Sequence, residues 1–155
     1  MNRLVLSLFS GVGAALAIGI LSFADSAQSD IILLMAPFGA TAVLVFGVPD
    51  SPLAQPKNVI LGHLITAFIG VFFVEFIGVT PLSLSIATGL AVSAMLFTKT
   101  THPPAGANPV LIMLAGQSWS FLISPVLLGA VILVVVGKMV SRVRASSMFT
   151  ENTTK

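Results

Sequence analysis

Residues 101–111, THPPAGANPVL, place a histidine, two adjacent prolines, a glycine and an asparagine in an otherwise apolar chain. A residue that precedes proline avoids the helical conformation, whereas proline itself fits the first turn of a helix. We therefore expect a helix to begin near Pro104 and to leave the N–H groups of Gly106, Ala107 and Asn108 unpaired. Because such a helix end carries about half a positive charge, this stretch predicts one side of an anion-binding site.

His102 lies at the break before this helix, next to Pro103. We expect its ring to line the anion pathway rather than to make a purely structural hydrogen bond. A histidine has a reference pKa of about 6.5, so proton movement and anion movement could be coupled through it.

The chain carries the same pattern a second time, as PFGAT, which begins at Pro37. At an offset of 67 and without gaps, residues 37–70 match residues 104–137 at 11 of 34 positions, whereas chance gives about three. We infer an internal repeat, although two kinks in closely packed helices are the alternative explanation of the prolines. The equivalent residues that would face the anion are Gly39 and Gly106, Ala40 and Ala107, and Thr41 and Asn108.

The composition is that of a membrane protein. Of the 155 residues, 56% are hydrophobic and 8% are charged, whereas a soluble domain has about 25% charged residues. The net charge of +2 comes from scattered residues, which form no basic face for a nucleic acid. Without cysteine the chain has neither a thiol nucleophile nor a thiolate metal site.

Charged and turn residues divide the chain into six apolar segments, at about 4–23, 31–48, 58–79, 82–98, 105–115 and 120–140. A helix needs about 20 residues to span a bilayer, so the fifth segment is too short, and a proline and a glycine interrupt the second. We predict an all-α membrane protein of two inverted three-segment repeats, a plan in which transporters bind substrate where broken helices meet. One transmembrane domain would cover residues 1–145, with repeats at about 1–79 and 80–141, and a polar tail would follow at 146–155.

The basic residues indicate the orientation. If six segments cross from a cytoplasmic N-terminus, every lysine and arginine falls in the cytoplasm, and the external loops hold Asp25 and Asp30. Four spans would move Lys57 and Lys99 outside, so six crossings with both termini cytoplasmic are favoured. We expect the first segment, which follows Arg3, to be a retained helix because it is longer than a signal-peptide core; a cleaved signal is the alternative.

Further polar residues surround the start of the third segment. Lys57 would either anchor the helix at the interface or attract the anion. His63 lies deeper, where a histidine is either functional or bonded to a carbonyl group. In the preceding loop Ser51, Gln55 and Asn58 are expected to form a turn with helix caps.

Three stretches, HPPAGAN at 102–108, PFGATAVLVF at 37–46 and SPLAQPKNVILGHLITAFIGV at 51–71, resemble the HPP family of integral membrane proteins. The resemblance covers nearly the whole chain. It implies four spans, against the six that the charges favour, and a loop before the third segment that is fixed against a pore. It also implies nitrite as the substrate, because cyanobacterial and plastid members are implicated in nitrite transport.

The sequence thus predicts a transporter or channel for a small inorganic anion, with nitrite first, in a bacterial inner membrane such as that of a cyanobacterium. A non-transporting assembly subunit is the alternative. A homo-oligomer is expected, because so small a bundle exposes most of its helices to lipid. An enzyme, a metal site and a cofactor are not expected, because the sequence has no nucleophile–base or metal-binding motif.

Overall fold

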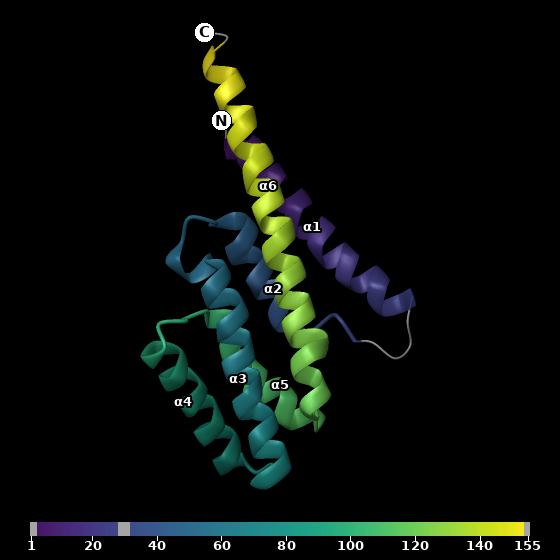
Figure 1. Ribbon diagram of the computed structural model, residues 1–155, viewed down its shortest axis with the longest axis vertical. Coiled ribbons are helices and arrows are strands. Elements are labelled where there is room, and N and C mark those ends of the chain that lie inside the picture. The colour runs from purple at the N-terminus through teal and green to yellow at the C-terminus, as the bar shows by residue number, and fades with distance from the viewer. Residues whose placement is uncertain (1–2, 28–31, 154–155) are drawn as a thin grey trace.

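The computed structural model describes residues 3–27 and 32–153, with side chains as far as residue 146; Asp30 lies outside this part of the chain. The described chain is helical and contains no β-strand. Figure 1 labels the helices α1 (Arg3–Ala27), α2 (Pro37–Ala42), α3 (Pro56–Phe76), α4 (Pro81–Phe97), α5 (Asn108–Ala115) and α6 (Leu128–Thr153).

Short turns extend three of these helices. A π-helical turn at Val43–Gly47 continues α2, and a 3-10 turn at Pro103–Ala107 leads into α5. Turns at Trp119–Leu122 and Ile123–Leu127 lead into α6, and a further 3-10 turn at Pro52–Ala54 lies in the loop before α3. The second and fifth segments are therefore short, as the sequence predicted.

Prolines and caps determine where the helices begin. Pro37, Pro56 and Pro81 occupy the first turn of their helices, where the missing N–H group costs no hydrogen bond. Thr80 and Ser83 form a capping box ahead of α4. The Ser83 N–H donates to Thr80 Oγ1 at 3.1 Å, and the Thr80 N–H donates to Ser83 Oγ at 2.8 Å.

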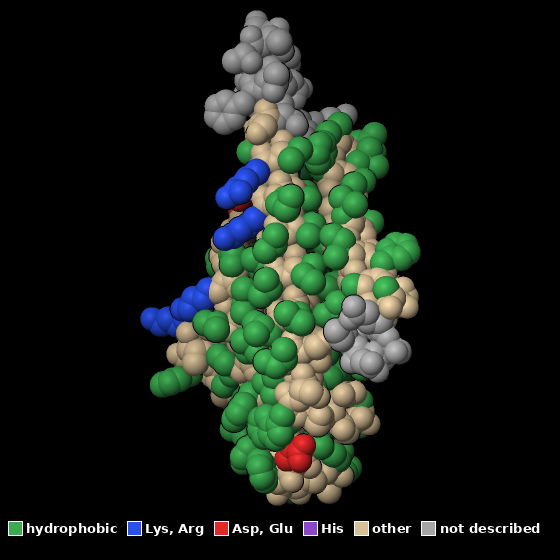
Figure 2. All heavy atoms as spheres, turned by 45° about the vertical axis from the view of Figure 1, so that its right-hand side comes forward, with side chains coloured by type: hydrophobic (Ala, Val, Ile, Leu, Met, Phe, Trp, Pro, Cys, Tyr) green, Lys and Arg blue, Asp and Glu red, His purple; other side chains and the backbone are tan. Residues whose placement is uncertain are grey.

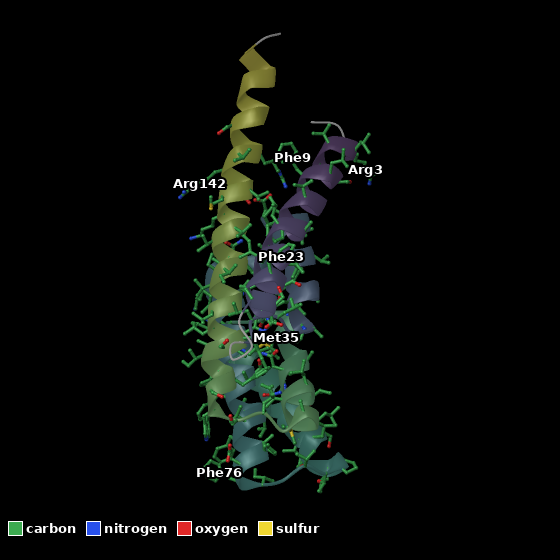
Figure 3. The ribbon with its side chains drawn as sticks, turned by 90° about the vertical axis from the view of Figure 1, so that its right-hand side faces the viewer. Arg3, Phe9, Phe23, Met35, Phe76 and Arg142 are labelled. Atoms are coloured by element: carbon green, nitrogen blue, oxygen red, sulfur yellow. The ribbon has the colours of Figure 1, made fainter. Side chains whose placement is uncertain are left out.

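Successive helices run in alternating directions (Figure 1). In that view α1, α2 and α3 point down, up and down, whereas α4, α5 and α6 point up, down and up. Figure 3 places Arg3 and Arg142 toward the end of the molecule where α1 begins, and Phe76 at the opposite end. The predicted all-α fold of two inverted three-segment repeats is confirmed.

The length and surface of the helices suit a bilayer. Three described helices, α1, α3 and Trp119–Ser146, are long and apolar enough to cross a membrane, whereas Pro37–Gly47 and α4 are shorter. Apolar side chains cover most of the face in Figure 2, and the lysine and arginine side chains seen there lie along its left edge, from the upper part to about mid-height. The chain is an integral membrane protein.

The second segment begins its helix at Pro37, as the repeat predicted. Residues 32–35 have no regular secondary structure, and α2 follows after them. The Leu33 N–H donates to the Asp25 carboxylate at 2.7 Å, and the Ser124 hydroxyl donates to the Ile32 carbonyl group. Side chains from α1 and from the start of the sixth segment thus satisfy backbone groups that a helix would satisfy internally.

Two glycines of α3 let it approach the second broken segment closely. A Cβ atom added to Gly62 would lie 2.9 Å from the Thr100 carbonyl oxygen. A Cβ atom added to Gly70 would lie 3.0 Å from the Cα atom of Pro109. Both distances involve backbone, so any larger residue at either position would push α5 away.

Two glycines of α6 let it approach the first broken segment equally closely. A Cβ atom added to Gly129 would lie 2.1 Å from the ring of Phe38. A Cβ atom added to Gly137 would lie 2.2 Å from the side chain of Val45. Helices α3 and α6 therefore each pack against the broken segment of the other repeat, which fixes the positions of the site residues.

Candidate functional site

Four polar side chains meet inside the bundle where the two broken segments face each other. Thr41 comes from α2, His63 from α3, His102 from the residue before the 3-10 turn and Asn108 from α5, and all four are fully buried. Thr41 Oγ1 lies 2.9 Å from Nε2 of His63 and 2.9 Å from Nε2 of His102. We call these four residues the central cluster.

One hydrogen-bonding pattern satisfies the central cluster with both rings neutral. The Leu53 carbonyl oxygen, 2.8 Å from Nδ1 of His102, can only accept, so His102 carries its proton on Nδ1. The Asn108 amide nitrogen donates to Nδ1 of His63 at 3.0 Å, so His63 carries its proton on Nε2. Donation therefore runs in one direction, from Asn108 through His63 to the Thr41 hydroxyl. From there it continues through His102 to the Leu53 carbonyl group.

The two polar atoms of the Asn108 amide differ: the nitrogen has hydrogen-bond partners and the oxygen has none among the described residues. Its nitrogen lies 3.0 Å from Nδ1 of His63, 3.0 Å from the His63 carbonyl oxygen and 3.0 Å from Thr66 Oγ1. Thr66 in turn donates to the Gly62 carbonyl oxygen at 2.8 Å. Asn108 Oδ1 is buried without a hydrogen-bond partner among the described residues, so it is open to a donor such as water.

The acidic side chains that the structure describes lie away from the central cluster. Asp50 and Glu75 are exposed, and Asp25 binds the Leu33 N–H group. Within the described ranges, no group of three or more histidine, cysteine, aspartate or glutamate side chains could hold a metal ion. The central cluster is therefore a polar site built from uncharged groups.

The backbone at the two helix starts differs from the sequence prediction. The Gly39 N–H donates to the Ala36 carbonyl oxygen at 3.1 Å, because Ala36 already has helical backbone angles. The Asn108 N–H donates to the Ala105 carbonyl oxygen, because the turn at Pro103–Ala107 precedes α5. The prediction of an unpaired N–H group at Asn108 is therefore wrong, and the helix starts offer an anion fewer backbone donors than expected.

The small residues of the two proline motifs lie outside the central cluster. A Cβ atom built on Gly39 or Gly106 meets no other part of the structure within 4 Å. Ala40 and Ala107 are exposed and line an apolar cavity of about 720 Å³, together with the prolines of both helix starts. The fold thus brings the two motifs together but turns their glycines and alanines outward.

The loop before α3 is held by the residues predicted to cap it. Ser51 Oγ accepts a backbone N–H at 3.3 Å, and Gln55 Nε2 donates to a backbone carbonyl group at 3.1 Å. Asn58 Nδ2 donates to the Thr101 carbonyl oxygen at 3.1 Å, which ties the loop to the break before α5. Lys57 is exposed and does not join the central cluster.

A cavity of about 410 Å³ opens between this loop and α6. Lys138 and Arg142 line it, and their spacing of four residues places them on one face of the helix. Val45, one helical turn after Thr41, forms another part of the wall. We call it the basic cavity. From the sequence these two cations were expected only to set the topology, although their spacing indicates a shared face.

Comparison with known proteins gives a family. Residues 2–149 match the family model described as HPP, transmembrane region. A transmembrane protein of Dictyostelium discoideum is 40% identical over 119 residues, which cover 74% of this chain and 37% of the relative. A second transmembrane protein of that organism is 34% identical over 144 residues, which cover 88% and 50%. The chain thus spans half or less of the length of these curated relatives, and no solved structure matches it.

Proposed function

The chain belongs to the HPP transmembrane family, and on that premise we propose that it transports a small inorganic anion, nitrite, across a lipid bilayer. The central cluster is the observation that carries this proposal. It gathers hydrogen-bonding side chains from both broken segments at one buried point, which is where inverted-repeat transporters bind their substrates. Buried polar groups at membrane depth are costly, which favours a functional role for them.

Side-chain donors would hold the anion. The Thr41 hydroxyl group can turn from His102, and the Nε2–H group of His63 can turn from Thr41, toward a bound oxyanion; a protonated His102 would add an Nε2–H group. Backbone N–H groups contribute less than the sequence predicted, because those of Gly39 and Asn108 are already paired. The resemblance of residues 102–108 to the family motif, rather than the geometry, supports nitrite over other small anions.

The basic cavity favours an anion over a cation as the substrate. Its lysine and arginine raise the local anion concentration by attraction. Arg142 lies toward the end of the bundle at which α1 begins, and Lys57 and Lys99 lie at helix ends that point the same way. By the positive-inside rule we propose that this end is cytoplasmic, in a bacterial inner membrane.

Large apolar side chains on the outer faces fit lipid and neighbouring copies. Val43, Phe97 and Leu114, for example, are 68%, 90% and 69% exposed. We propose that such faces contact acyl chains and further copies of the chain in a homo-oligomer. The proposed transport involves no enzymatic step, cofactor or nucleic-acid partner.

Nitrite uptake into liposomes that contain only the purified chain tests the proposed function. We expect internal nitrite to rise much faster than in protein-free liposomes of the same lipid composition. Addition of a second anion at equal concentration on the outside would show how selective the entry is. Uptake equal to that of protein-free liposomes would overturn the proposal and favour the assembly subunit.

The orientation has its own test, because the chain contains no cysteine. Single cysteines at positions 57 and 99 can be labelled with an impermeant thiol reagent in intact cells and in inverted vesicles. We expect labelling of both positions in inverted vesicles only. Labelling of both in intact cells would contradict six crossings with cytoplasmic termini.

A further inference from the structure

On the basis of the proposed function, we infer that one proton travels with each anion and that His102 carries the proton. The central cluster contains two histidines, and their hydrogen bonds make them unequal as proton acceptors. The unequal geometry, rather than the mere presence of histidine, identifies the coupling residue.

His102 can accept a proton without movement of any non-hydrogen atom. Its free nitrogen, Nε2, receives the Thr41 hydroxyl hydrogen in the neutral cluster. The Thr41 hydroxyl group has a second acceptor, the Pro37 carbonyl oxygen, at 3.1 Å. After protonation of His102, the hydroxyl hydrogen turns to Pro37, and the Thr41 oxygen accepts from both His102 and His63.

His63 has no such alternative. Its free nitrogen, Nδ1, faces the Asn108 amide nitrogen at 3.0 Å, so a proton there would set one donor against another. The amide cannot simply turn over, because its nitrogen also bonds to the His63 carbonyl oxygen at 3.0 Å. A turned amide would place Asn108 Oδ1 against that carbonyl oxygen. His63 is therefore held neutral while His102 is free to change.

A protonated His102 needs a negative charge that the described residues around it do not supply. The titratable group in contact with it is His63, whose ring centroid lies 5.0 Å away. The charged side chains on the neighbouring loops and helices are exposed; they are Asp50, Lys57, Glu75 and Lys99. An uncompensated buried cation is strongly unfavourable, so protonation of His102 and binding of an anion favour each other.

The transport step balances without any redox change. One nitrite ion and one proton enter from the same side, and a new N–H bond forms at Nε2 of His102. On the other side that bond breaks, and the proton and the anion leave together. The Thr41 hydroxyl hydrogen returns from Pro37 to His102 and restores the neutral cluster. The pair carries no net charge, so the membrane potential should not drive it.

Nitrogen-15 spectra of the two ring systems test the choice of residue, because the chain has only two histidines. The full chain is labelled on histidine and placed in lipid nanodiscs, and His63→Gln and His102→Gln variants assign the signals. Without nitrite we expect Nδ1–H on His102 and Nε2–H on His63. With saturating sodium nitrite we expect His102 to become doubly protonated and His63 to stay unchanged. Protonation of His63 instead would overturn the inference.

Calorimetry with sodium nitrite in two buffers of different ionisation enthalpy counts the protons taken up on binding. We expect about one proton per nitrite for the unaltered chain and for Gly89→Ala, whose Cβ atom meets nothing within 4 Å, and none for folded His102→Gln. Nitrite binding without proton uptake would overturn this inference and leave the proposed function standing. Absence of nitrite binding and transport in all conditions would overturn both.

Discussion

The two repeats hold their broken helices in the same way but fill the centre of the bundle differently. Gly62 and Gly70 of α3 pack against the second broken segment, and the equivalent Gly129 and Gly137 of α6 pack against the first. The members of each pair are separated by about two helical turns, so they lie on one side of their helix. The long helix α3 or α6 of each repeat thus supports the broken segment of the other repeat.

The two histidines of the central cluster do not follow this two-fold relation. At the same offset of 67, His63 is matched by Ala130 and His102 is matched by Met35. Ala130 and Met35 are both buried in the apolar core. The duplicated scaffold therefore carries a buried histidine at only one of each of these pairs of equivalent positions. This difference allows a hydrogen-bond chain with one direction, which two equivalent halves would not produce.

The largest expected effect follows from interrupting the hydrogen-bond chain of the central cluster at Thr41, the residue that joins both histidines. Thr41→Val keeps the shape and removes the hydroxyl group, so Nε2 of His63 and Nε2 of His102 both lose a partner. Each unsatisfied buried group costs about 1–3 kcal/mol, and we expect nitrite uptake to fall at least tenfold. Thermal unfolding in detergent and uptake into liposomes measure the two effects.

Thr41→Ser is the matched control, because it keeps the hydroxyl group and should keep most of the uptake. The equivalent residue of the other repeat gives the comparison. Asn108→Leu leaves Nδ1 of His63 without its donor, whereas the His63 carbonyl oxygen and Thr66 Oγ1 keep other hydrogen bonds. It also removes the unpartnered Oδ1, so its cost to stability should be smaller. Equal losses for Thr41→Val and Asn108→Leu would contradict the unequal roles of the two repeats.

The next largest effect concerns the glycines that the repeats share. Gly129→Ala places a methyl group where the buried Phe38 ring lies, and Gly62→Ala places one against the Thr100 carbonyl group. Overpacking of this kind costs about 1–3 kcal/mol, so both variants should unfold at a lower temperature than the unaltered chain. Gly89→Ala is the control, since its Cβ would meet nothing within 4 Å. A similar unfolding temperature for all three variants would contradict the close packing of α3 and α6 against the broken segments.

Much of this architecture could be predicted from the sequence. The six apolar segments follow from composition and from turn residues, and the inverted plan follows from an odd number of segments in each repeat. The meeting of Thr41 with Asn108 and His102 near one point follows from the duplicated prolines. Proline acts on the local backbone through its fixed geometry, so its effect can be read from neighbouring residues alone.

The remaining features depend on contacts between distant residues. The sequence assigns Gly39 and Gly106 to the site and leaves Gly62 and Gly129 as mere repeat matches, because every glycine looks alike until its neighbours are known. The unpaired N–H group predicted for Asn108 is wrong because a 3-10 turn precedes α5. Whether an N–H group at a helix start is free depends on how the preceding residues turn, and a neighbouring segment decides that.

A smaller effect is expected from the basic cavity, which lies between the loop before α3 and α6. Lys138→Gln and Arg142→Gln should each raise the KM for nitrite about three- to tenfold at low ionic strength, with kcat unchanged, because attraction concentrates the anion near the entrance. The effect should shrink at high salt. Lys99→Gln, the same charge change outside the cavity, should leave KM unaltered. An identical change in all three variants would indicate net charge rather than a local site.

The smallest effect is expected at Gly39 and Gly106, the glycines on the outward faces of the two broken segments. If the anion touched the backbone there, valine at either position would block a hydrogen bond worth about 1.5–3 kcal/mol and weaken binding roughly 10- to 150-fold. The Gly39 N–H is already paired, and a Cβ at either glycine enters open space. We therefore expect Gly39→Val and Gly106→Val to bind nitrite within about twofold of the unaltered chain, measured by calorimetry on folded protein. A tenfold loss in either variant would move the anion from the side chains of the central cluster to the helix starts. It would also restore equivalence between the two halves, because both glycines belong to the duplicated pattern.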